Sequence, residues 1–300
     1  MAILEKTNEE SFYSDLVSIS SYLYKKALTD LPSDVRRAIA TASEIEEGTG
    51  RKFLDIMIKS VDVSDETGII LCQDTGICVF FVKWGGKFLW KLRGDRIIQA
   101  LQEGIEHATA TYDLRSSIVH PLTRKNLQNN RGTRIPDVHF EFDESDVFEV
   151  RLLPKGSGSE NMSFLNMLSP ADGINAVKRF ILESVVDAGP RPCPPTIVGI
   201  GIGGTADLCM SLAKKAVLRP VGQPHPESEI AELEREIFAA VNRMEIGPQG
   251  LGGKVTSFAV NIEYAATHIS MNPVAVNIQC WRGERASAVI NNSGEISYGY

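Results

Sequence analysis

The sequence predicts an α/β protein in which mixed sheets are flanked by helices, with a helical N-terminal segment and functional loops at strand ends. Segments whose apolar residues recur at helical spacing alternate along the chain with short apolar segments typical of strands. The last three predicted strands follow one another with no helix between them, so the sheets cannot be purely parallel. One domain is therefore expected over residues 1–300, with residues 1–65 as the helical segment.

The helical segment is predicted from apolar residues spaced three to four apart from about Glu10 onward, and these are Phe12, Leu16, Ile19 and Leu23. Ser33 is expected to cap a second helix, because it follows Pro32 and precedes another periodic stretch. Later helices are predicted over 95–112, 170–188, the residues before about 218, and 226–244. Glu232, Glu234 and Glu236 are expected on the solvent face of the last of these.

Strands are predicted at 77–84, 138–142, 147–153, 196–202, 255–264, 273–279 and 286–291. The second and third of these are expected to pair with each other, because their phenylalanines and valines alternate with charged residues. A helix-like stretch is expected after the glycine loop that begins at Lys155.

Composition excludes several classes of function. The chain has 300 residues, a net charge of −7 and no block of five or six basic residues, so nucleic acid is an unsuitable partner. Its longest apolar runs are too short to span a bilayer, and Met1–Lys6 shows no secretion signal pattern. A cytoplasmic location is expected. Disulfides are disfavoured there, so the five cysteines are expected to bind metal, act in catalysis or remain inert.

Three cysteines stand in contexts unsuited to a buried core thiol. Cys72 begins the loop Cys-Gln-Asp-Thr-Gly, Cys193 lies among prolines that hold its backbone extended, and Cys280 ends an apolar strand. They are far apart in sequence, so the short paired spacing of a structural zinc site is absent. Three thiolates could hold three corners of a four-iron cluster, which this chemistry permits and the spacing does not demand. Cys78 and Cys209 are predicted to be core thiols.

Two glycine-rich segments admit opposite interpretations. Lys155-Gly-Ser-Gly-Ser-Glu-Asn161 follows a strand, and its backbone N–H groups could bind an anion, although an ordinary loop has the same composition. Gly199-Ile-Gly-Ile-Gly-Gly204 satisfies the G-x-G-x-x-G pattern of dinucleotide-binding folds. That fold needs an acidic residue at a strand end about 20 residues later, where this chain has Pro224-His225-Pro226 instead. An NAD-binding oxidoreductase is therefore a remote alternative.

Two further side chains could act on a ligand. His268 lies in a loop between predicted strands and is a candidate acid or base. Arg115 follows a predicted helix, where it could neutralise the helix dipole or bind a carboxylate.

Six segments together resemble the α subunit of the two-subunit, iron–sulfur-dependent (class I) fumarate hydratases and of the related L-tartrate dehydratases. They occur in the family's order over about residues 71–290 and are Cys72-Gln73-Asp74-Thr75-Gly76, Leu114-Arg115, Lys155 to Asn161, Cys193-Pro194-Pro195, Ile246 to Lys254, and His268 to Cys280. One departure is Ser157, where many members have glycine.

The resemblance implies a [4Fe–4S] cluster held by Cys72, Cys193 and Cys280, with a fourth iron open to substrate. It also implies that Gln73, Asp74 and Arg115 line the substrate site, and that Gly158 offers a backbone N–H. His268 would approach the substrate from the same or the opposite protomer, with Asp74 and His268 as the catalytic pair.

The implied activity is the reversible hydration of fumarate to (S)-malate, catalysed only together with a separate β subunit as α2β2. The substrate is a small dicarboxylate dianion, so the site needs cationic or N–H donors, and Arg115 is the one clear cation among its residues. L(+)-tartrate dehydratase and mesaconate hydratase are the alternatives within the family. A non-catalytic cluster-carrying subunit is a third class of function, and the presence of Asp74, Arg115 and His268 argues against it.

Overall fold

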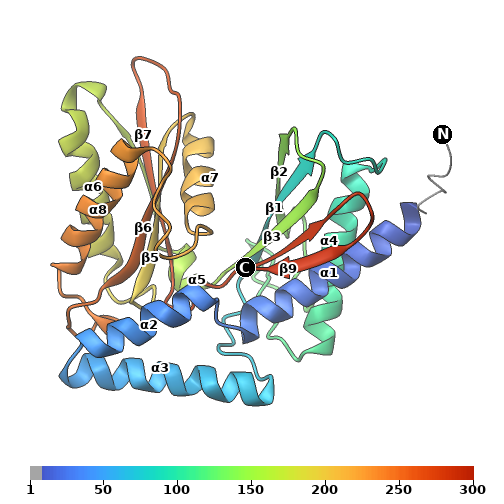
Figure 1. Ribbon diagram of the computed structural model, residues 1–300, viewed down its shortest axis with the longest axis horizontal. Helices are drawn as coiled ribbons and strands as arrows, with labels where there is room; N and C mark the ends of the chain where they lie inside the picture. Colours follow the sequence, from blue (N-terminus) through green and yellow to red (C-terminus); the bar gives the residue numbers. More distant parts are fainter. Residues whose placement is uncertain (1–8) are drawn as a thin grey trace. The chain divides into compact units, whose positions relative to one another are not determined.

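The computed structural model describes residues 9–300 and confirms an α/β fold with two mixed sheets flanked by helices (Figure 1). The helical N-terminal segment is present as α1 (Glu9–Thr29), α2 (Ser33–Ile45) and α3 (Gly48–Thr67). Residues 1–8 lie outside the described residues, and the segment predicted to show no secretion signal pattern is among them. Ser33 is the first helical residue, so the prediction that it caps α2 is wrong. Pro32 holds the cap position, and no side chain caps that end.

The described chain divides into two units, each treated by itself below. Unit 1 comprises 9–30, Thr67–Gly156 and Glu284–Tyr300, and unit 2 comprises Leu31–Glu66 and Ser157–Gly283. The expected single domain over residues 1–300 stays a prediction.

Unit 1 contains a five-stranded sheet with the strand order β2-β1-β3-β8-β9. Its elements are α1, β1 (Ile77–Gly85), α4 (Gly94–Thr111), β2 (Asp137–Asp143), β3 (Phe148–Lys155), β8 (Ala286–Ile290) and β9 (Ile296–Gly299). The predicted pairing of the second and third strands is wrong, because β1 lies between β2 and β3. Alternation along each strand predicts which face is buried but not which neighbour it pairs with.

Helices α1 and α4 lie side by side and cover one face of this sheet (Figure 1). Apolar side chains from α1, α4, β1, β3 and β8 form one buried cluster there, and its members include Leu16, Ile19, Ile97, Leu101, Phe80, Val82, Phe148 and Val150. Each fully buried side chain of this size contributes about 1.5–3 kcal/mol relative to an exposed one. The predicted amphipathic helices and alternating strands thus meet in this core.

Unit 2 contains a four-stranded sheet with the order β4-β7-β5-β6. Its strands are β4 (Ser163–Leu168), β5 (Thr196–Gly203), β6 (Ser257–Ala265) and β7 (Asn272–Gln279). Its remaining elements are α2, α3, α5 (Ser157–Glu160), η1 (Pro170–Asp172), α6 (Gly173–Ala188), α7 (Ala206–Ala216), α8 (Ser228–Asn242) and η2 (Pro248–Gly250). Strand β4 occupies the stretch predicted to be helix-like, so that prediction is wrong. It pairs with β7, more than a hundred residues later, which the local sequence does not announce.

The two faces of the unit 2 sheet are covered differently (Figure 1). Helices α6 and α8 pack on one face over valines and isoleucines of β5, β6 and β7, and α7 packs on the other. Helix α7 approaches β5 very closely at Gly201, where a Cβ would lie 1.9 Å from the Cys209 carbonyl oxygen. The first glycines of the 199–204 run are therefore required by helix–strand packing.

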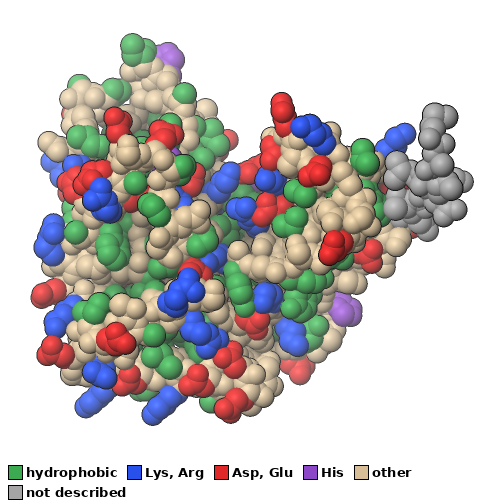
Figure 2. All heavy atoms as spheres, viewed as in Figure 1, with side chains coloured by type: hydrophobic (Ala, Val, Ile, Leu, Met, Phe, Trp, Pro, Cys, Tyr) green, Lys and Arg blue, Asp and Glu red, His purple; other side chains and the backbone are tan. Residues whose placement is uncertain are grey.

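Side chains of both charges mix on the surface (Figure 2), and one glutamate that was predicted to face solvent is buried. Figure 2 shows basic and acidic side chains interspersed over the α2–α3 region of the viewed face. On α8, Glu234 is 5% exposed, so its predicted solvent position is wrong. The Arg219 guanidinium donates to its carboxylate at 2.8 Å, and this partner makes the burial possible.

Candidate active site

The Cys72–Gly76 loop of unit 1 is fixed at its C-terminal end. The Thr75 hydroxyl donates to the Arg115 carbonyl oxygen at 2.8 Å, and the buried Tyr24 hydroxyl donates to the Thr75 carbonyl oxygen at 3.1 Å. Gly76 has φ +76°, and a Cβ there would lie 2.6 Å from the carbonyl carbon of Lys155. The loop is thus packed directly against β3, and only glycine combines this positive φ with so close an approach to the strand backbone.

This loop gathers four of the predicted site residues. Cys72 is exposed, and the Asp74 backbone N–H donates to its Sγ at 3.4 Å. The Arg115 backbone N–H donates to the Gln73 Oε1 atom at 3.0 Å. Asp74 lies beside the start of the glycine loop, since a Cβ at Gly156 would come within 2.9 Å of its Oδ2. A thiol, an amide, a carboxylate and the backbone of an arginine are thus brought together in unit 1.

Unit 2 brings the other two predicted sulfur ligands near each other. Cys193 is exposed between two buried prolines, and its N–H donates to the Pro190 carbonyl oxygen at 3.0 Å. The N–H of Trp281 donates to the Cys193 carbonyl oxygen at 3.2 Å. Cys280, the residue before Trp281, directly follows β7 and is partly exposed. The two loops are therefore bonded to each other through their backbones.

Gly158 lies against the Cys193 segment in the same unit. A Cβ at Gly158 would come within 2.8 Å of the Arg191 carbonyl oxygen, so a glycine is needed for this approach. The short helix α5 that carries Gly158 is anchored by a 2.6 Å ion pair between Glu160 and Lys214 of α7. Ser157, the departure from the family pattern, begins α5 with its side chain exposed, so a hydroxymethyl group fits there.

His268 is not brought to these residues of unit 2. It lies in the exposed connection between β6 and β7, where its Nδ1 accepts the Ser270 N–H at 3.2 Å. Figure 1 shows this connection extending beyond the sheet. His268 precedes β7 and Cys280 follows it, and eight strand residues at about 3.3 Å each separate them by roughly 26 Å.

The remaining two cysteines are core thiols, as predicted. Cys78 and Cys209 are at most 1% exposed. Burial raises the pKa of Cys209 to about 11 and that of Cys78 well above its usual value. The thiol form is therefore favoured at both, whereas a metal ligand must be a thiolate.

The donor set fits an iron–sulfur cluster. Cys72, Cys193 and Cys280 offer soft sulfur donors at exposed or partly exposed positions, and Cys72 Sγ accepts a backbone N–H. Two of these cysteines belong to unit 2 and one to unit 1. Among residues 9–300, neither unit alone brings three His, Cys, Asp or Glu side chains together as a metal site.

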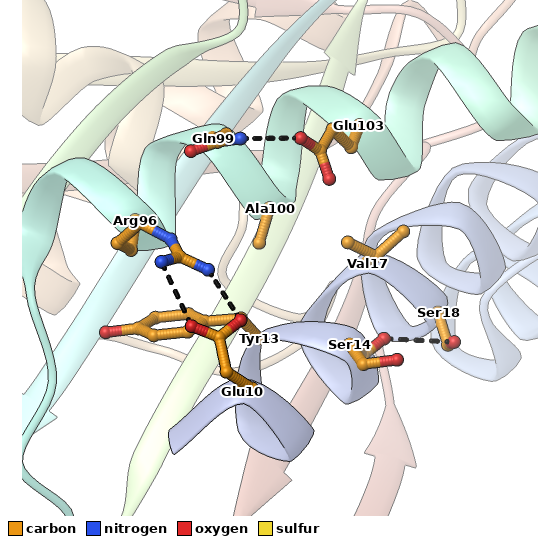
Figure 3. A pocket seen from close by; sticks show the side chains of 9 residues that line it. All are labelled: Glu10, Tyr13, Ser14, Val17, Ser18, Arg96, Gln99, Ala100 and Glu103. Carbon is orange, nitrogen blue, oxygen red and sulfur yellow. Dashed lines mark hydrogen bonds and ion pairs between the residues drawn. The ribbon is translucent and has the colours of Figure 1, made fainter. Parts of the chain in front are cut away.

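Two surface grooves of unit 1 contain none of the predicted site residues. One, of about 310 Å³, lies between α1 and α4 (Figure 3). Its charged residues satisfy one another, because Arg96 bonds Glu10 at 2.9 Å and stacks over the Tyr13 ring. A second groove, of about 530 Å³, is lined by α4 and by residues 113–114 and 128–129. Neither groove therefore adds a residue to the candidate site.

The glycine run of β5 does not form a nucleotide-binding turn. Its first glycines lie within the strand against α7, and Pro224-His225-Pro226 lies in the connection between α7 and α8. The structural features that favoured an oxidoreductase are thus accounted for by packing.

Among the residues that the structure describes, no helix combines the length and the apolar composition that a membrane span requires.

One residue next to the site was missed at the level of sequence. Gln249, within Ile246–Lys254, donates to the Pro194 carbonyl oxygen from its backbone N–H at 2.9 Å and from its Nε2 at 3.3 Å. The motif carried part of the family resemblance, but no residue in it was assigned a role. A glutamine flanked by Pro248 and Gly250 was the available signal.

Two kinds of comparison show which known proteins this chain is similar to. The family described as fumarate hydratase (fumerase) matches residues 18–289. A protein of Methanocaldococcus jannaschii, provisionally named an L(+)-tartrate dehydratase subunit alpha, is 45% identical over 267 residues, covering 88% of this chain and 93% of that protein. The L(+)-tartrate dehydratase subunit alpha of Escherichia coli K12 is 30% identical over 295 residues, covering 96% and 95%. The chain therefore belongs to the fumarate hydratase family of hydro-lyases.

Proposed function

We propose that this chain is the α subunit of a [4Fe–4S]-dependent hydro-lyase that interconverts fumarate and (S)-malate together with a separate β subunit. The observation that carries the proposal is the loop in which Cys72, Gln73 and Asp74 meet the backbone of Arg115. It joins a cluster ligand to polar side chains suited to a dicarboxylate. Cys193 and Cys280 supply the other two thiolates.

The cluster, when bound, supplies a Lewis acid that polarises the hydroxyl group lost from malate. The other tasks fall to the chain's own residues. The Arg115 guanidinium binds one substrate carboxylate through paired N–H donors. Since Gln73 Oε1 is held by the Arg115 N–H, its Nε2 is the end of that amide that can donate to substrate. The N–H of Gly158 offers a further donor to the dianion.

Asp74 moves the proton of the oxygen that is added or lost. In hydration, its carboxylate accepts a proton from water as the oxygen attacks one alkene carbon, and the other alkene carbon takes a proton from a second acid. In dehydration the two transfers reverse. The second acid and the additional cations that a dianionic substrate needs are assigned to the β subunit.

His268 is assigned to the site of another α protomer. Its separation from Cys280 by the length of β7 prevents both from serving one site within a single rigid unit 2. An α2β2 assembly gives each site a histidine from the second α subunit. The connection that carries His268 is exposed, as such an exchange requires.

L(+)-tartrate is the second candidate substrate, because the two relatives described above carry that name. Tartrate differs from malate by one hydroxyl group, and its dehydration gives oxaloacetate instead of fumarate. The test is anaerobic reconstitution of the α and β subunits with iron and sulfide, followed by assays with malate, fumarate, tartrate and mesaconate.

The proposal predicts that malate and fumarate have the highest kcat/KM and that Asp74→Asn abolishes turnover without loss of iron. A higher kcat/KM for tartrate would move the assignment to the second candidate. Inactivity of the iron-loaded complex toward all four compounds would overturn the hydro-lyase assignment for this chain.

A further inference from the structure

The Cys193 backbone adopts a conformation that other parts of unit 2 must hold in place. Cys193 has φ +57°, in the left-handed region that residues other than glycine and asparagine seldom enter, so the extended backbone predicted for it is wrong. The residue also precedes a proline, which restricts its backbone further. Such a conformation persists only where the surroundings determine it.

Three hydrogen-bonding groups surround this residue. Its own N–H bonds to Pro190, and its carbonyl oxygen accepts the N–H of Trp281. The third group is Gln249, which donates twice to the carbonyl oxygen of the next residue, Pro194. Of these bonds, only the one from Gln249 Nε2, at 3.3 Å, comes from a side chain and can be removed by substitution.

The loop that carries Gln249 is itself rigidly seated. Gly250, at φ +74°, would place a Cβ 2.3 Å from Pro190 Cβ, so the loop lies directly on the Cys193 segment. At the other end of the loop, the carboxylate of Glu46 accepts the N–H of Val255, and Glu46 is only 2% exposed. The loop is therefore a fixed support and not a mobile cover.

We propose that Gln249 is a positioning residue that fixes the Cys193 thiolate in the orientation required by the cluster. The amide acts through Pro194 and not by contact with the metal. Pro194 has no N–H, and the Cys193 N–H already donates to the Pro190 carbonyl oxygen. The Pro194 carbonyl oxygen is therefore the backbone group through which a hydrogen bond can hold this part of the segment. The inference rests on the proposed function, since it assigns Cys193 to the cluster.

The test uses Gln249→Glu, which keeps the side chain's shape but replaces the donor with an acceptor facing a carbonyl oxygen. Gln249→Met, which has no donor and no charge, is the second variant. Gln99→Glu is the matched control, because Gln99 on α4 also donates its Nε2 to an oxygen, Glu103 Oε1, at 2.8 Å (Figure 3). Circular dichroism shows whether each variant is folded.

The first measurement is hydrogen–deuterium exchange of the iron-free chain. Loss of one hydrogen bond predicts about fivefold faster exchange of the Cys193 and Trp281 amides in both Gln249 variants, with no change in Gln99→Glu. The second is the rate at which a chelator removes iron from the reconstituted protein, which should rise by a similar factor in both Gln249 variants. A purely structural role would speed exchange throughout unit 2 and leave these two amides undistinguished.

Unchanged exchange at Cys193 and Trp281 in both Gln249 variants would overturn the positioning role. Faster exchange with unchanged iron release would also overturn it, because Cys193 would then be held for another purpose. Failure of the wild-type chain to take up iron would instead refute the proposed function. In that case the exchange result alone decides whether Gln249 holds the segment.

Discussion

Replacement of Gly76 by alanine tests how the Cys72–Gly76 loop is placed on β3. Gly76 has φ +76°, and an added Cβ would lie 2.6, 2.7 and 2.8 Å from three backbone atoms of Lys155. These are main-chain atoms of a strand paired with β1, so they cannot rotate away as a side chain would. The loop or the strand must shift.

The magnitude has two parts. A left-handed backbone costs alanine roughly 1–2 kcal/mol. Forcing a methyl group into a filled space costs about 1–3 kcal/mol more. Gly76→Ala should therefore lower the free energy of unfolding by about 2–5 kcal/mol.

Gly68→Ala separates the two parts. Gly68 belongs to the same unit and has φ +72°, but a Cβ there would meet nothing within 4 Å. Only the backbone part applies, so the loss should be about 1–2 kcal/mol. Equilibrium unfolding in urea of both variants and the wild type gives the comparison. Equal losses for the two variants would show that the loop does not lie on β3, and would remove the basis for placing Asp74 beside Gly156.

Three further predictions concern other parts of the chain. In the iron-free, folded chain, Cys72 and Cys193 should react with iodoacetamide much faster than Cys78 and Cys209. The reason is that burial raises the pKa of Cys209 to about 11 and that of Cys78 further. Rapid labelling of Cys209 before unfolding, detected by mass spectrometry, would contradict this prediction. Arg219→Ala should lower the free energy of unfolding by about 3–5 kcal/mol, because it leaves the buried Glu234 carboxylate unpaired. Lys178→Ala, at the solvent-exposed pair with Glu236, should lower it by less than about 1 kcal/mol. Similar losses for the two variants in thermal or urea unfolding would refute the assigned burial of Glu234. The Ser145 hydroxyl and N–H, with Lys83, lower the pKa of Asp143 from 3.8 to about 2, so the contribution of this carboxylate to stability is fully present above about pH 4 and is lost as the pH falls toward 2. The difference in unfolding free energy between the wild type and Asp143→Asn should therefore be constant from about pH 5 to 8 and should shrink below about pH 4. A difference that grows on acidification would contradict the assigned direction of the pKa shift.

Much of the fold follows from local sequence, because burial of one face leaves a periodic pattern. The segment with Leu16 and Ile19 at helical spacing became α1, and the apolar stretch 77–84 became β1. Strand neighbours do not follow, since the apolar face of β2 is equally compatible with β1 or β3. Glu234 was misplaced for a similar reason, because the partner that permits its burial, Arg219, lies on another element.

The site was predictable to the extent that its residues are clustered in the chain. Cys72, Gln73 and Asp74 are consecutive, so one loop fixes them together, and Arg115 was a candidate from its place after a predicted helix. Gln249 bonds a carbonyl oxygen 55 residues away, and no local pattern records such a contact. His268 was assigned by resemblance, and its distance from Cys280 becomes evident only when β7 is seen to separate them.

The most direct test of the central claim is the iron content of cysteine variants after anaerobic reconstitution of the whole chain with its β subunit. The account predicts about four irons per wild-type α chain and a large loss in Cys72→Ser, Cys193→Ser and Cys280→Ser. Cys78→Ser and Cys209→Ser, provided they fold, should retain the wild-type content. A wild-type chain without iron, or equal iron in all five variants, would contradict the claim that these three sulfur atoms hold a cluster.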